Sequence, residues 1–256
     1  MKKLLLALFA LTYFSFYTMA QLSYEKRIEF EVKDGYIDEK LMLFGKNGFI
    51  ISSRNLKSKD KEFEWKFEKY SPDLKLVKTE SINLSKKLND AEVFTGTEHT
   101  HTLFKDSKGN FNIISVESEN LTLHQATGTF PKKTRVAGMT VLGDYAIINA
   151  SIKSSPFIFT INWKTGERSL IPIIIDDVKP KKTSIIGVEV LEKSEEIMVY
   201  INAFVGFKKS DIYVLQLDNK GEKKSTYNLT ANIEENLTAI SASKIIENNY
   251  VFTGTY

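Results

Sequence analysis

The sequence contains no cysteine, only three histidines and only two tryptophans among its 256 residues. The absence of cysteine excludes disulfides, a thiol nucleophile and a cysteine-ligated zinc or iron–sulfur centre. It also leaves no attachment site for the lipid of a lipoprotein. A folded domain must therefore be held together by its own hydrophobic core, and residues 21–256 are numerous enough to form one.

Long hydrophobic runs are also scarce, because only one occurs, at the N-terminus. "MKKLLLALFALTYFSFYTMA" has a basic start, a short apolar stretch and small residues at its end, which predicts a signal peptide at residues 1–20. A retained membrane anchor is the alternative, but Thr12, Ser15 and Thr18 interrupt the apolar stretch. We expect an exported protein, periplasmic, cell-surface or extracellular, that is not a lipoprotein and has no transmembrane segment after cleavage.

Neither sign of charge dominates. Lys and Arg number 35 and Asp and Glu number 32, so removal of Lys2 and Lys3 with the leader leaves 33 against 32, a net charge of +1. This balance does not call for nucleic acid as a specific partner.

Motifs of known enzyme classes are missing too: there is no Gly-x-Ser-x-Gly elbow, Walker loop, dinucleotide fingerprint or His-Glu-x-x-His. His99 and His101 are two residues apart and would share one face of a strand, but two ligands do not make a metal site. We interpret them as surface histidines and predict no metal and no cofactor. The adjacent Asp176 and Asp177 are interpreted as part of a solvated loop, because a glycosidase needs carboxylates from separate elements.

What the sequence does contain is a repeat. The segments "GFIISSRN", "HTHTLFKD", "YAIINASI", "IMVYINAF" and "YVFTGTY" resemble one another and begin near Phe49, His99, Tyr145, Ile197 and Tyr250. A spacing of about 50 residues is typical of propellers and solenoids. An aliphatic run precedes each segment, and two further strand-like runs follow the first four, separated by turns such as "SPDLK", "KTGE" and "DNKGE".

Four short antiparallel strands per unit predict an all-β fold, a β-propeller-like array of four-stranded blades. A twisted β-sandwich is the alternative, since regular spacing alone does not prove this arrangement. We predict one domain at residues 21–256, with four blades and a partial fifth, and "LSYEKRIEFEV" near its start as a strand that could complete the last blade. Because "YVFTGTY" supplies only a second strand, we expect the chain to be truncated at its C-terminus.

The repeat, the leader and the missing cysteine resemble the exported propeller-like proteins of Bacteroidota. The resemblance runs from Tyr24 to the end and depends on the form of the repeat, so it implies a fold and a compartment and carries over no catalytic residue.

Lysines are unevenly distributed in this scheme. Loops that join strand two to three, and each blade to the next, belong at one end of the blades; they hold 14 lysines against 8 acidic residues, a charge of +6. Lysines that only confer solubility are the alternative. The candidate binding residues are Lys132, Lys133, Lys181, Lys182, Lys208 and Lys209.

Two functional classes follow from these patterns. The first is an exported, non-catalytic binding or scaffold module that recognises an anionic glycan or another protein through this lysine-rich face. The second is the propeller portion of a secreted hydrolase or glycan-active enzyme, with its catalytic part outside this sequence.

Overall fold

The computed structural model describes residues 34–57, 61–206, 209–230, 238–246 and 249–255, with the backbone alone for residues 38, 39, 209 and everything after residue 237. The chain divides into two compact units, residues 1–34 and 35–256, and all described strands belong to the second. The predicted leader and the strand expected near residues 22–32 lie outside the described residues. No helix in the described ranges has the length and apolar character needed to cross a bilayer.

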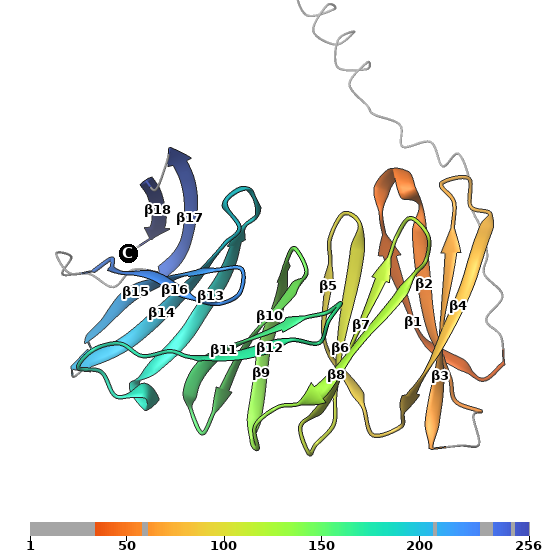
Figure 1. Ribbon diagram of the computed structural model, residues 1–256, viewed down its shortest axis with the longest axis horizontal. Coiled ribbons are helices and arrows are strands. Elements are labelled where there is room, and N and C mark those ends of the chain that lie inside the picture. The colour runs from red at the N-terminus through yellow and green to blue at the C-terminus, as the bar shows by residue number, and fades with distance from the viewer. Residues whose placement is uncertain (1–33, 58–60, 207–208, 231–237, 247–248, 256) are drawn as a thin grey trace, which may run out of the picture. The chain divides into compact units, whose positions relative to one another are not determined.

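Four sheets, each of four antiparallel strands, follow one another along the chain (Figure 1). The first contains β1 (Tyr36–Leu43), β2 (Phe49–Asn55), β3 (Glu62–Tyr70) and β4 (Leu76–Ser85). The second contains β5 (Asn89–Thr95), β6 (His99–Lys105), β7 (Asn110–Glu117) and β8 (Leu123–Thr129). The third contains β9 (Thr134–Leu142), β10 (Tyr145–Ile152), β11 (Ser155–Asn162) and β12 (Arg168–Pro172).

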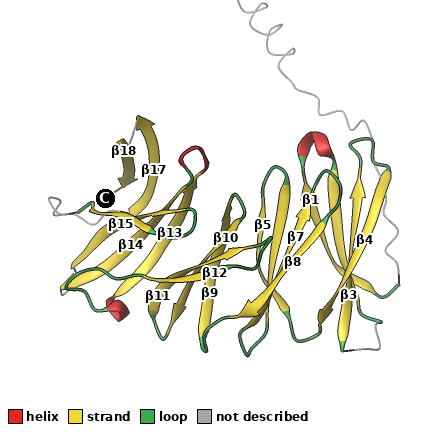
Figure 2. Ribbon diagram, viewed as in Figure 1, coloured by secondary structure: helices red, strands yellow, loops and turns green. Residues whose placement is uncertain are grey.

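The fourth sheet contains β13 (Thr183–Leu191), β14 (Glu196–Gly206), β15 (Lys209–Asp218) and β16 (Lys223–Asn228), and β17 (Thr238–Ile246) pairs with β18 (Asn249–Thr255). The described helices are single 3₁₀ turns, η1 (Gly45–Asn47), η2 (Pro180–Lys182) and η3 (Glu192–Ser194), drawn in red in Figure 2. The fold is therefore all-β, an incomplete propeller of four-stranded blades, as the sequence predicted. Second strands begin at Phe49, His99, Tyr145, Glu196 and Asn249, within one residue of the predicted positions.

Neighbouring sheets pack face to face, which excludes a two-sheet sandwich for the described strands. In β7, Ile113 is buried among residues of the third sheet, whereas Ile114 is buried among residues of the first. In β10, Ile148 faces the second sheet and Ile147 faces the fourth. Because both faces are covered, these central strands read as continuous apolar runs, and each buried isoleucine contributes about 2–3 kcal/mol.

Two hairpins show how Asp and Gly close the turns. Asp106 Oδ1 accepts hydrogen bonds from the backbone N–H of Lys108 and Asn110 (both 2.8 Å), and Gly109 adopts φ 95°. Asp218 Oδ1 does the same for Lys220 (2.9 Å) and Glu222 (2.8 Å), with Gly221 at φ 93°. Glycine tolerates this left-handed region, so the "SKG" and "NKG" turns are ordinary hairpins.

Candidate anion-binding face

The strand order determines which loops share an end of the blades. In an antiparallel sheet with consecutive strands, the hairpin between strands two and three lies at the same end as the exit to the next sheet. The exits at residues 86–88 and 130–133 are too short to cross a strand's length, so the next sheet starts at that end as well. We call the described residues that join one strand to the next at this end the lysine-rich end: 56–57, 61, 86–88, 106–109, 130–133, 153–154, 173–182 and 229–230.

The two ends of the blades differ in charge. The lysine-rich end carries eleven lysines and three aspartates among the described residues, a charge of +8. The opposite end comprises the other loops: 44–48, 71–75, 96–98, 118–122, 143–144, 163–167, 192–195 and 219–222. It carries five lysines and eight acidic residues, a charge of −3. The near-neutral chain is thus polarised, in the direction that the sequence predicted.

Four of the six candidate lysines can be placed on this end. Lys132 and Lys133 lie in the turn between β8 and β9, and Lys181 and Lys182 lie in η2, between β12 and β13; all four are exposed. Lys208 lies outside the described residues. Lys209 is the first residue of β15, where the backbone alone is described.

A recurring turn presents these lysines. "PKKT" occurs at residues 131–134 and again at 180–183, and in both copies the threonine Oγ1 donates a 2.7 Å hydrogen bond to the proline carbonyl three residues earlier. The connection between the first two sheets has the related turn "SKKL", residues 85–88, in which Leu88 N donates to the Ser85 carbonyl at 2.9 Å. Sequence reasoning found the lysines but missed the recurrence of "PKKT" at a separation of 49 residues, which was the available signal.

Some lysines of the blades are paired with a carboxylate and others are not. Within the described part of the chain, Lys132, Lys133, Lys181 and Lys182 form no ion pair with a carboxylate. The same holds for four exposed lysines of the opposite end: Lys46, Lys75, Lys193 and Lys220. Ion pairs do join Lys66 to Glu68 (2.8 Å), Lys78 to Glu80 (2.9 Å), Lys164 to Asp144 (2.7 Å) and Lys224 to Glu196 (3.3 Å). The loop lysines therefore keep their charge available for an external anion.

Three carboxylates lie at the lysine-rich end, and the charge of +8 already includes them. Burial alone would raise the pKa of Asp106, but hydrogen bonds from the Asn110 side chain and from the backbone of Asn110, Lys108 and Gly109 lower it overall. The Asp106 carboxylate thus accepts hydrogen bonds within its own hairpin. Asp176 and Asp177 are exposed in the loop before η2, as predicted.

The three histidines lie together, which the sequence did not predict. Phe94, His101, Ser115 and His124 occupy one row across β5, β6, β7 and β8. The ring of Trp163, in the turn between β11 and β12 of the third sheet, contacts all three. Its centroid lies 5.2 Å from that of His99, 5.2 Å from that of His101 and 5.3 Å from that of His124.

The surface interpretation is wrong for His101, which is 2% exposed. Burial, with a smaller contribution from the charge of His99, lowers its pKa from 6.5 to about 4. A 2.7 Å hydrogen bond joins His101 Nδ1 to Ser115 Oγ, a contact that a serine nucleophile and its base would make. Ser115 is 0% exposed, however, so no substrate reaches the pair in this conformation. The described residues contain no cluster of histidine and acidic side chains that could hold a metal ion.

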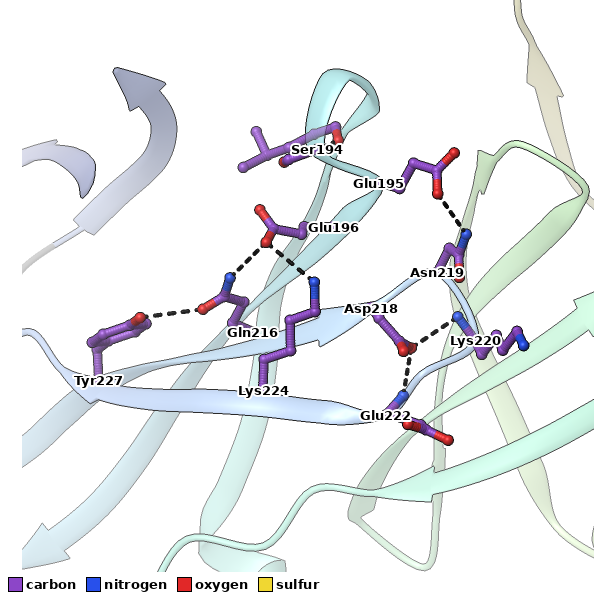
Figure 3. A network of polar contacts seen from close by, with 11 residues as sticks. Ser194, Glu195, Glu196, Gln216, Asp218, Asn219, Lys220, Glu222, Lys224 and Tyr227 are labelled. Carbon is purple, nitrogen blue, oxygen red and sulfur yellow. Dashed lines mark hydrogen bonds and ion pairs between the residues drawn. The ribbon is translucent and has the colours of Figure 1, made fainter. Parts of the chain in front are cut away.

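A second polar network lies in the fourth sheet, near the opposite end (Figure 3). The buried Glu196 accepts hydrogen bonds from Gln216 Nε2 (2.9 Å) and Lys224 Nζ (3.3 Å), and Tyr227 donates to Gln216 Oε1 (3.2 Å). These bonds satisfy a carboxylate that would otherwise be buried without a partner, which is a structural role. A pocket of about 280 Å³ nearby is lined by Val141, Leu142, Gly143, Glu192, Glu195 and Asn219.

Neither a protein-family model nor a curated protein sequence matches this chain. Similar solved structures include a puromycin hydrolase mutant complexed with PGG, with a TM-score of 0.41 and 10% identity over 85% of this chain and 33% of that one. Cobalt-substituted Synechocystis apocarotenoid oxygenase gives a TM-score of 0.36 and 8% identity over 75% of this chain and 49% of that one. The chain thus spans about a third and about half of their lengths. Both are propeller-like folds with four-stranded blades, while the architecture of this chain is established by its own strand order.

Proposed function

We propose that residues 35–256 form a non-catalytic binding module of an exported protein and that the lysine-rich end recognises an anionic glycan. The observation that carries this proposal is the charge separation of +8 against −3 between the two ends of the blades. Four exposed lysines at the positive end have no carboxylate partner among the described residues. Their potentials add at close range, although salt screens exposed charges within about 8 Å at physiological ionic strength.

The composition of this end favours a glycan over a protein. Protein interfaces depend on tyrosine, tryptophan and arginine, and the described residues of the lysine-rich end contain none of the three. Lysine is a point charge on a flexible stem, whereas arginine recognises a fixed carboxylate or phosphate geometry. Lysines alone therefore suit a polymer whose anionic groups vary in position. Phe130, the aromatic residue of this end, is 1% exposed and offers no stacking surface to bases.

The alternative, the propeller portion of a hydrolase or glycan-active enzyme, places catalysis outside this sequence. Within the described residues, the His101–Ser115 contact is buried and offers no site to a substrate.

Retention on immobilised heparin at low ionic strength tests the proposal. One variant carries Lys132→Gln, Lys133→Gln, Lys181→Gln and Lys182→Gln. A matched control changes four exposed lysines of the opposite end to glutamine: Lys46, Lys75, Lys193 and Lys220. We expect the first variant to elute at clearly lower salt than the wild type, and the control to elute close to the wild type. Equal losses in both would show that net charge alone matters.

The four control lysines are exposed in loops of the opposite end. The strand pattern also places Lys66, Lys78, Lys223 and Lys224 away from the lysine-rich end, but they are poorer controls. Lys66, Lys78 and Lys224 make the ion pairs given above, and Lys66 is buried beneath the Tyr36 ring at 4.7 Å. Substitution of these three lysines would remove contacts within the fold as well as positive charge.

A further inference from the structure

Three successive connections each present two adjacent lysines, and we call these pairs the lysine dyads: Lys86–Lys87, Lys132–Lys133 and Lys181–Lys182. In each, the lysines are the two central residues of a four-residue turn. The backbone N–H of the last residue donates to the carbonyl of the first: Leu88 to Ser85 (2.9 Å), Thr134 to Pro131 (3.2 Å) and Thr183 to Pro180. The same backbone hydrogen bond therefore closes the turn in all three connections, although Lys133, alone among the six lysines, has a left-handed φ of 67°.

The dyads also follow one another in space. Each turn leads directly into the first strand of the next sheet, β5, β9 or β13. β5 contacts β9, and β9 contacts β13, so these three strands are neighbours in the order of the sheets. Facing sheets pack about 10 Å apart, which places successive dyads on the order of 10 Å from one another.

We infer that the three dyads form one ladder that binds a single linear polyanion, with the Lys132–Lys133 dyad in the middle. This inference rests on the proposed function and adds the form of the ligand: an unbranched sulfated or carboxylated polysaccharide. A chain must reach about 20 Å to contact all three dyads. Each further dyad is engaged intramolecularly, so affinity depends on ligand length more than on any single contact.

Most members of the ladder are free to contact a ligand. Lys87 and the four lysines of the other two dyads are exposed. Lys86 is half-buried, with its ammonium group 5.0 Å from the centre of the Phe63 ring. The remaining carboxylates of this end, Asp176 and Asp177, precede the third dyad and lie outside the three turns.

The test measures dissociation constants for heparin-derived oligosaccharides from disaccharide to decasaccharide at low salt. Three variants each change one dyad to glutamine, and the Lys46→Gln/Lys75→Gln double variant is the control. Inorganic polyphosphates of increasing length form a second arm, which separates a requirement for sugar from a requirement for linear charge. Thermal unfolding midpoints close to that of the wild type confirm that all variants fold.

The ladder predicts a position effect that net charge does not. With oligosaccharides just long enough to span two adjacent dyads, loss of an outer dyad leaves one adjacent pair intact and weakens binding only about two-fold. Loss of the middle dyad leaves no adjacent pair and weakens binding about ten-fold or more. With long ligands, each dyad removed lowers the magnitude of the slope of log affinity against log salt by about two. Two ammonium groups then no longer displace counterions from the polyanion.

Equal effects of the three dyads at every length would overturn the ladder and leave the proposed function standing, since binding would still map to this end. Failure of the wild type to bind heparin at low salt, or an equal loss in the control, would overturn the proposed function as well. If the protein bound polyphosphate tightly and did not bind the oligosaccharides, the inferred ligand would be a phosphate polymer and not a polysaccharide. Capture of an acidic protein with no response to oligosaccharides would contradict the inferred ligand class.

Discussion

His101 should make the stability of the protein fall as the pH drops below neutrality. Its side chain lies in the seam between the second and third sheets, next to Phe94, His99 and Trp163, and is 2% exposed. Its folded-state pKa is about 4, against 6.5 for an unperturbed histidine. Between these values the unfolded chain takes up a proton that the folded chain does not, so the free energy of unfolding decreases as the pH falls.

The size of this effect follows from the shift. A difference of one pKa unit corresponds to about 1.4 kcal/mol, so His101 contributes about 3 kcal/mol of stability above pH 7. That contribution is lost progressively from about pH 6.5 to pH 4. Native domains have free energies of unfolding of about 5–15 kcal/mol, so a loss of about 3 kcal/mol is at least a fifth of the total and should be measurable.

Urea unfolding at a series of pH values from 8 to 4 measures the effect, with tryptophan fluorescence as the signal. His101→Gln removes the titrating group and keeps a hydrogen-bonding group beside Ser115, so its stability should vary less over this interval. His124→Gln removes a ring that contacts Trp163 but leaves His101 in place, and should retain the wild-type dependence. A wild-type stability that stays constant between pH 6.5 and pH 4, or an unchanged dependence in His101→Gln, would refute the reasoning.

Three further substitutions test the account of the fold by urea unfolding. Asp106→Ala removes the acceptor of the β6–β7 hairpin and should lower the free energy of unfolding by about 1–3 kcal/mol; Ser107→Ala is the control and should change little. Gly221→Ala should cost more than about 1 kcal/mol, because φ is 93° and the added Cβ would lie 2.2 Å from Ile171 Cδ1; Gly143→Ala has no such neighbour and should cost less. Glu196→Ala removes the hydrogen bond that the buried Gln216 amide donates to Glu196 and should cost about 1–3 kcal/mol, whereas substitution of the exposed Glu195 should cost little. In each case, equal effects in the variant and its control would contradict the contact described.

The repeat made the fold predictable from sequence because alternation and turn residues recur in every blade. Phe49, His99 and Tyr145 mark the start of second strands in both the prediction and the structure. Packing of Ile113 and Ile114 on opposite faces of β7 is what a continuous apolar run in a central strand indicates.

Contacts between blades could not be predicted in this way. The spacing of His99 and His101 shows only that they share a face, and nothing local indicates that Trp163, in the next sheet, covers them. Pairing partners of this kind depend on neighbouring strands, which a single strand's pattern does not reveal.

Lysine footprinting tests the central claim most directly, because it needs no substitution. The protein is treated with an amine-acetylating reagent with and without heparin, and modification of each lysine is quantified by mass spectrometry. The account predicts protection by heparin of the six lysines in the three dyads, and unchanged modification of Lys46, Lys75, Lys193 and Lys220 at the opposite end. Protection of those four lysines to the same degree as the dyads would contradict recognition through the lysine-rich end.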